Sequence, residues 1–139
     1  MIQIDKELIN GLFDKAAASD RKRMNYDLRT SSNDNSQRML NALLPGTEVA
    51  IHRHPNSNEN VLLLCGKMDE IIFDAEGNEM ERIHLDPSVG NFGCVLPAGA
   101  WHTVEVLEPS IIYEGKDGKY GEDGSETLDE YKAKTVLNR

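Results

Sequence analysis

The chain has 139 residues and carries 15 Lys and Arg against 24 Asp and Glu, which gives a formal net charge of −9. This length is typical of one domain, and the acidic balance argues against a nucleic-acid-binding protein, which usually presents a basic stripe to phosphates. The longest apolar run, residues 61–65, is far shorter than the roughly 20 residues of a membrane-spanning helix, the N-terminus lacks the features of a secretory signal, and two cysteines make no disulfide scaffold. We therefore expect a reduced globular domain in the cytoplasm, with no nucleic-acid partner and no membrane partner.

The first 36 residues are expected to form a helix and a loop that pack on the rest of the domain. Apolar side chains recur at four-residue spacing and form one stripe of a helix: Ile4, Leu8, Leu12 and Ala16. Asp5 is placed to cap this helix at its N-terminus, and the helix is expected to end near residues 18–19. Residues 31–36 carry short polar side chains, which are typical of a loop.

After residue 36 the pattern changes to short apolar runs that are separated by turn residues. Runs rich in Val, Ile and Leu predict strands at residues 37–44, 48–54, 59–65, 69–74, 80–85, 93–96, 102–105 and 110–113. Short strands at this spacing indicate an all-β fold, a small barrel or double-sheet sandwich over residues 37–115. Residues 116–139 are charged and contain glycine, and we expect either a tail or a short helix there.

Two histidines and a glutamate of this region have the spacing of metal ligands. His52 and His54 are two residues apart in a predicted strand, so both side chains point to the same face, about 6.7 Å apart along the chain. Glu59 opens the next strand after a short connection. Two imidazoles and one carboxylate on adjacent strands form a mixed nitrogen and oxygen site that suits Fe, Mn, Ni, Zn or Cu.

A third imidazole follows a tight turn later in the chain. Pro97 and Gly99 form the turn, and His102 begins the strand after it, where it can join the first three side chains. Three His and one Glu leave one or two positions of a five- or six-coordinate ion open for water or substrate. Such an open site is typical of a catalytic metal rather than of a structural one.

These residues resemble the two motifs of the cupin superfamily. The segment Gly46-x5-His52-x-His54-x4-Glu59-x6-Gly66 matches the first motif at every fixed position, and residues 97–102 are similar to the centre of the second. The resemblance implies a cupin fold, a double-stranded β-helix or jelly-roll barrel, here with an N-terminal helix. It also implies one divalent metal ion, Fe, Mn, Ni or Zn, on four ligands: His52, His54, Glu59 and His102.

Residues 23–116 further resemble the WbuC family of small cupin-fold metalloproteins, through segments 23–28, 37–43 and 52–54. That family is associated with bacterial surface-polysaccharide gene clusters. The resemblance therefore implies a place in polysaccharide biosynthesis and a small-molecule substrate or ligand.

Several other side chains are candidates for the same site. Arg23, Asn25, Tyr26 and Arg38 are candidates for substrate binding, and the Tyr26 phenol is the candidate for acid–base catalysis. The alternatives stay open, since exposed arginines are normally only solvated and a tyrosine at a domain edge often packs. Cys65 shares a strand face with Glu59 by alternation and could face the cavity, although a small buried filler is the commoner role.

Two functions from different classes remain. One is a metal-dependent enzyme on a small oxygenated metabolite such as a sugar or nucleotide sugar, acting as an isomerase or epimerase or as an Fe(II) oxygenase. The other is a ligand-binding or regulatory module without turnover. A metal that only stabilises the barrel is a third reading, and we expect a homodimer because paired barrels cover exposed strand edges.

Overall fold

The computed structural model describes residues 1–119 and 122–137, and it begins with the predicted helix. Helix α1 spans Lys6–Ala18. Asp5 is its N-cap and accepts a hydrogen bond from the Leu8 backbone N–H at 3.0 Å, and Ser19 is its C-cap. The stripe buries Leu12 and Ala16 against the sheet. The expected helix, its cap and its end are therefore confirmed. No helix in the described residues is both long and apolar enough to cross a membrane.

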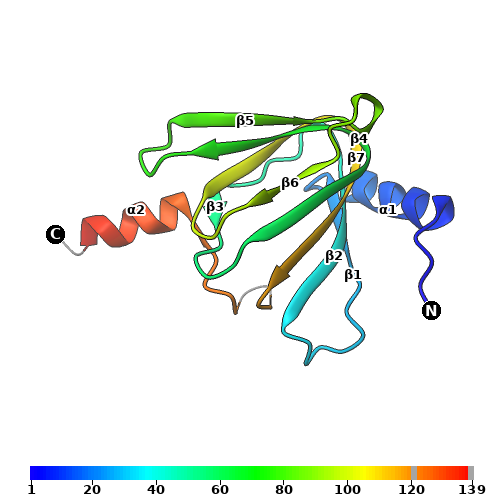
Figure 1. Ribbon diagram of the computed structural model, residues 1–139, viewed down its shortest axis with the longest axis horizontal. Coiled ribbons are helices and arrows are strands. Elements are labelled where there is room, and N and C mark those ends of the chain that lie inside the picture. Colours follow the sequence, from blue (N-terminus) through cyan, green and yellow to red (C-terminus); the bar gives the residue numbers. More distant parts are fainter. Residues whose placement is uncertain (120–121, 138–139) are drawn as a thin grey trace.

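Eight strands, within the described residues, form one antiparallel sheet (Figure 1). Their bounds are β1 Arg23–Asp27, β2 Ser36–Leu43, β3 His52–Arg53, β4 Glu59–Phe73, β5 Glu79–Leu85, β6 Gly93–Leu96, β7 Trp101–Asp117 and β8 Glu126–Thr127. A short 3₁₀ helix, η1, spans Pro87–Val89, and helix α2 spans Leu128–Leu137. The two α-helices lie at opposite ends of the sheet in Figure 1.

The two long strands, β4 and β7, pair along most of their length and belong to both halves of the sheet. In one half the order is β1, β2, the end of β7, the start of β4, and β6. In the other half it is β8, β3, the start of β7, the end of β4, and β5. The inner core draws residues from both halves and lies between them: Leu43, Val61, Leu63, Met68, Leu85, Leu96, Val106 and Ile112.

β4 passes from one half to the other through a series of bulges. The β4–β7 register shifts between Leu63 and Met68, and Gly66 adopts a left-handed φ of +99° there. A Cβ at Gly66 would lie 2.3 Å from Ser110 Oγ, so only glycine fits. The sequence predicted separate strands on each side of this point, and likewise on each side of residues 106–109. That division was wrong, because a bulged strand bends without ending.

The same bulges reverse the face on which Cys65 lies. Leu63 pairs with Ile112 of the inner core, but Cys65 pairs with Ile111, which packs under α1. The alternation that placed Cys65 on the cavity face with Glu59 therefore fails, and the residue contributes to a second cluster on the outside of the sheet. We call this the helix-facing cluster; its buried members are Leu12, Ala16, Leu40, Ala42 and Ile111.

The two ends of the chain add strands that the sequence did not indicate. β1 pairs with β2 inside the segment that was expected to be a helix and a loop. β8 pairs with β3, and α2 follows it in the segment that was expected to be a tail or a short helix. β8 is only two residues long, and β1 alternates Met24 and Tyr26 with polar residues over only five positions, which is a weak signal. The domain limits at residues 36 and 115 stay a prediction.

Candidate metal centre

The structure brings together the four side chains that the motif singled out. His52 lies in β3, His54 follows it, Glu59 is the first residue of β4, and His102 is the second residue of β7, directly opposite His52 in the register. One ligand atom from each lies within 4.8 Å of the others. The Nε2 atom of His54 is 2.7 Å from Glu59 Oε2, and Nε2 of His102 is 3.5 Å from the same oxygen. We call these four residues the metal group.

Backbone carbonyls orient two of the three imidazoles. Nδ1 of His52 lies 2.9 Å from the carbonyl oxygen of Ala50, and Nδ1 of His102 lies 2.9 Å from that of Ala100. A carbonyl oxygen only accepts, so each Nδ1 carries the proton and donates it. In both rings Nε2 is therefore the nitrogen whose lone pair can bind a metal ion.

Residues near the C-terminus orient the third imidazole. Nδ1 of His54 lies 2.6 Å from Ser125 Oγ and 3.2 Å from Asp123 Oδ2. Sequence reasoning missed both residues. They are about 70 positions from His54 along the chain, and no spacing or motif connects them to it.

The group is buried and contains polar atoms that lack a partner. Glu59 and His102 are only 6 % and 3 % exposed, and among the described residues Glu59 Oε2 and His102 Nε2 have no hydrogen-bond partner outside the metal group. Burying a carboxylate is costly unless it is paired, and a cation between these atoms would pair with Glu59 and with the imidazole nitrogens at once. The donor set therefore fits a divalent metal.

The local environment favours the metal-binding forms of Glu59 and His52. Burial opposes ionisation of Glu59, but the facing His102 and His54 hold its pKa below the ordinary value. Burial and the neighbouring His102 lower the pKa of His52 to about 4, so its imidazole is neutral at pH 7. Burial acts against protonation of His102, yet Glu59 raises the pKa of that imidazole. The group thus already attracts positive charge, and it could bind a metal ion.

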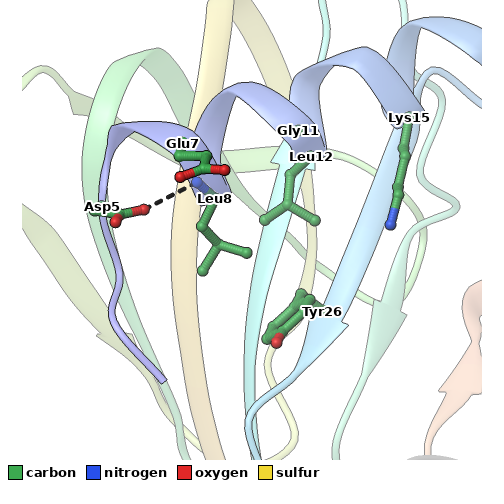
Figure 2. Close-up of a pocket in the computed structure, with 7 residues that line it drawn as sticks. All are labelled: Asp5, Glu7, Leu8, Gly11, Leu12, Lys15 and Tyr26. Atoms are coloured by element: carbon green, nitrogen blue, oxygen red, sulfur yellow. Dashed lines mark hydrogen bonds between the residues drawn. The ribbon is translucent and has the colours of Figure 1, made fainter. Parts of the chain in front are cut away.

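The candidates for substrate binding are not brought together with the metal group. Tyr26 pairs with Leu40 and packs in the helix-facing cluster, on the outside of the sheet. Figure 2 shows it under α1 beside Leu12, where both line a pocket of about 350 Å³. Arg38 forms an ion pair with Asp34. The geometry does not support an acid–base role for Tyr26, which stays a prediction.

The other two candidates lie on β1, at the edge of the sheet. Arg23 donates from Nη1 to the carbonyl oxygen of Glu48 at 3.0 Å. Asn25 is exposed and pairs with Asn41 of β2, whose side chain faces the barrel interior. Their roles in substrate binding also stay predictions.

Two further carboxylates, which the sequence did not single out, face the interior. Glu114 of β7 is a diagonal neighbour of Glu59 and accepts a hydrogen bond from Asn41 Nδ2 at 3.3 Å. Burial and Glu59 raise the pKa of Glu114 to about 7. Glu70 of β4 is 2 % exposed, its Oε2 has no partner among the described residues, and burial raises its pKa well above the ordinary value. Alternation along each strand could have identified Glu70 and Glu114 only if the sequence had shown which face of the strand lines the barrel interior.

Known structures share this fold at low sequence identity. The capsular polysaccharide assembling protein CapF from Staphylococcus aureus is 18 % identical, with a TM-score of 0.65 over 79 % of this chain and 32 % of its own. An oxalate oxidase in complex with the substrate analogue glycolate is 12 % identical, with a TM-score of 0.59 over 79 % of this chain and 57 % of its own. An oxalate decarboxylase from Lactobacillus farciminis, in a formate complex, is 15 % identical, with a TM-score of 0.57 over 81 % and 32 %.

These likenesses confirm the predicted cupin fold. This chain spans about a third of the CapF chain that it matches. A family model described as a domain of unknown function, DUF6016, matches residues 4–85. No curated protein matches the sequence. The finer resemblance to the WbuC family stays a prediction.

Proposed function

The chain belongs to the family of domains of unknown function DUF6016, and we propose that it is a metal-dependent enzyme that acts on a small oxygenated metabolite. A sugar or nucleotide sugar of surface-polysaccharide metabolism is the substrate class that we favour. The observation that carries the proposal is the buried metal group, in which Glu59 Oε2 and His102 Nε2 have no hydrogen-bond partner outside the group among the described residues.

Each side chain of the metal group has a defined part. His52, His54 and His102 would offer Nε2, and Glu59 would offer a carboxylate oxygen. An ion held there would supply Lewis acidity toward a carbonyl or hydroxyl oxygen. Glu114 lies next to the group inside the barrel, and because its pKa is about 7 it is suited to hold or release a proton near neutral pH. This chemistry serves isomerisation or epimerisation, and in the variant, an Fe(II) oxygenase, an iron held by the same four side chains would supply the chemistry with dioxygen.

The similar structures support the substrate class. CapF is described as a capsular polysaccharide assembling protein, which agrees with a sugar derivative. The ligands of the other two, glycolate and formate, are small molecules rich in oxygen. A small oxygen-bearing ligand therefore suits this fold, although fold alone does not fix function.

A second candidate is a module that holds a metal or ligand without turnover. The observation that favours it is the low exposure of the metal group, since His54, Glu59 and His102 are all buried.

We also propose that the protein is a homodimer located in the cytoplasm. Leu62, Phe92 and Val95 leave an apolar face of β4 and β6 exposed, which a second copy would cover. A monomer by light-scattering chromatography at micromolar concentration would contradict the dimer.

The test of the enzyme is metal binding followed by turnover. Metal-free protein is titrated with Mn²⁺, Fe²⁺, Ni²⁺ and Zn²⁺ in a calorimeter, and sugar phosphates and nucleotide sugars are then offered with the metal that binds. We expect one site per chain, lost in Glu59→Gln and kept in the control His84→Gln, whose ring pairs with Asp69 outside the group. Absence of binding overturns the proposal, and binding without any turnover favours the module.

A further inference from the structure

We propose that Asp123, acting with Ser125, is the positioning residue of the metal centre, and that the C-terminal segment, residues 122–127, thereby completes the site. The inference rests on the proposed metal-binding function. Asp123 lies outside residues 4–85, which the family model matches. Its role as a positioning residue is therefore inferred from its contacts in the structure and not from the family match. It does not contact the place where an ion would sit; it acts through His54.

The contacts form a continuous hydrogen-bonded chain. His54 Nδ1 lies 2.6 Å from Ser125 Oγ, and Ser125 Oγ lies 2.5 Å from Asp123 Oδ1. The other carboxylate oxygen of Asp123 lies 3.2 Å from His54 Nδ1 and pairs with Lys116 Nζ. The Ser125 backbone N–H also donates to Asp123 Oδ1 at 3.1 Å. Both oxygens of the carboxylate are therefore occupied.

This chain fixes a proton on Nδ1 of His54. An ionised carboxylate only accepts, so Ser125 must direct its single hydroxyl proton to Asp123. The serine oxygen is then an acceptor, and His54 Nδ1 must be the donor. Nε2 is then the nitrogen that faces Glu59 Oε2, at 2.7 Å inside the metal group, and a bound ion would take its lone pair. The segment thus does for His54 what backbone carbonyls do for the other two imidazoles.

Lys116 contacts the carboxylate oxygen of Asp123 that Ser125 does not contact. The side chains of Lys116 and Asp123 are 2 % and 1 % exposed, and they form a buried ion pair. Lys116 also pairs in register with Glu59, so the ion pair lies beside the metal group. Removal of one partner would leave the other charge buried and alone, which is costly.

The segment is held in place by contacts that do not involve Asp123. β8 pairs with β3, Arg53 Nε donates to Glu126 Oε1 at 2.9 Å, and the Leu128 N–H donates to the Ile51 carbonyl oxygen at 2.8 Å. The Arg53 guanidinium also lies over the ring of Trp101 at 4.4 Å. Different residues therefore anchor the segment and position the His54 ring, so a mutation can weaken one of these interactions and leave the other intact.

The experiment compares metal affinity and ring tautomer in matched variants. Asp123→Asn, combined with Lys116→Met so that no buried charge is left alone, removes the positioning carboxylate. Ser125→Ala removes only the first acceptor and leaves the ion pair intact. Glu126→Gln weakens the anchor, and Glu122→Gln changes an exposed carboxylate in the same segment. Zn²⁺ affinity is measured by chelator competition, and the His54 tautomer by long-range ¹H–¹⁵N NMR of the metal-free protein.

We expect roughly 10–100-fold weaker Zn²⁺ binding in the double variant, the range found when the outer partner of a ligating histidine is lost. Ser125→Ala should show a smaller loss, and both variants should lose the fixed proton on His54 Nδ1. Glu122→Gln and Glu126→Gln should keep affinity and tautomer, whatever their melting temperatures. If the double variant does not fold, Ser125→Ala decides the question alone.

Three results would overturn the inference. The first is unchanged affinity and tautomer in the folded double variant and in Ser125→Ala. The second is an equal loss in Glu126→Gln, which would mean that the segment is only anchored there. The third is a wild-type His54 whose Nδ1 carries no proton. Failure of the wild-type protein to bind any metal would instead contradict the proposed function, and the tautomer measurement would still test Asp123 and Ser125 separately.

Discussion

Glu70 gives a sensitive measure of the charge that the barrel interior holds. It is 2 % exposed, its Oε2 has no partner among the described residues, and its electrostatic neighbours Glu59 and Glu114 are acids. Burial, with those two acids, raises its pKa well above the ordinary value. In Glu70→Gln the side chain keeps its shape and cannot ionise. We expect this variant to be more stable than the wild type in metal-free protein near pH 8.

The direction follows from the raised pKa of the folded state. Such a group contributes its full stability below the pKa of the unfolded chain, about 4.3, and that contribution is lost as the pH rises through the folded pKa. Wild type and Glu70→Gln should therefore be equally stable near pH 4 and diverge as the pH rises. An unsatisfied buried polar group costs about 1–3 kcal/mol. For a chain of this length that corresponds to about 3–10 °C in melting temperature at pH 8.

Asp69, the residue before Glu70, provides the matched control because its pKa is shifted in the opposite direction. It lies on the outer face, where Arg82 Nη1 donates to it at 3.0 Å and His84 Nδ1 lies 2.7 Å away. Burial opposes ionisation of Asp69, but these partners hold its pKa below the ordinary value. Its contribution is therefore present above the unfolded pKa and lost as the pH falls, so Asp69→Asn should be destabilised at pH 8.

The assay is thermal unfolding followed by circular dichroism from pH 4 to pH 8, with a chelator present. A positive ion in the metal group would lower the cost of the Glu70 charge, so adding Zn²⁺ should narrow the gap between the wild type and Glu70→Gln. The reasoning is refuted if Glu70→Gln is less stable than the wild type at pH 8, or if their difference does not change with pH.

Two further expectations concern the bulge and the thiols. Gly66→Ala should lower the free energy of unfolding by about 2–5 kcal/mol, since it adds left-handed strain to a contact with Ser110. Gly90→Ala has the same φ sign but open space around it and should lose less, so equal losses in urea unfolding would refute the clash. Burial raises the pKa of Cys94 to about 12 and also raises that of Cys65, so iodoacetamide at pH 8 should label neither until the protein is unfolded. Rapid labelling of the folded protein, seen by mass spectrometry, would contradict this.

Features that depend on neighbours in sequence could be predicted. Asp5 caps α1 because cap and helix are three residues apart, and the apolar stripe follows from the helical repeat. The metal group could be found because its motif spacing encodes a strand, a short connection and a turn. His52 and His54 share a face by alternation, which needs no knowledge of the rest of the fold.

The interior side of each strand could not be predicted, because it depends on register across the sheet. Alternation failed at Cys65, where three register shifts turn β4 over. Tyr26 was placed near the site by its position in the sequence, whereas pairing with Leu40 sends it to the outside under α1. In the sequence Glu70 and Glu114 cannot be told from solvent-exposed strand carboxylates, because only the pairing of the sheet defines which face is enclosed.

The amino-acid order alone determined the first helix, the β-rich character and the identity of the four side chains that meet. Those features come from short-range periodicity and from residue chemistry. Only the three-dimensional packing decided what surrounds those four: the Asp123 and Ser125 contacts to His54, the ion pair with Lys116 and the acids inside the barrel. These contacts join residues up to about 70 positions apart, and a local pattern carries no information about which distant segments will meet.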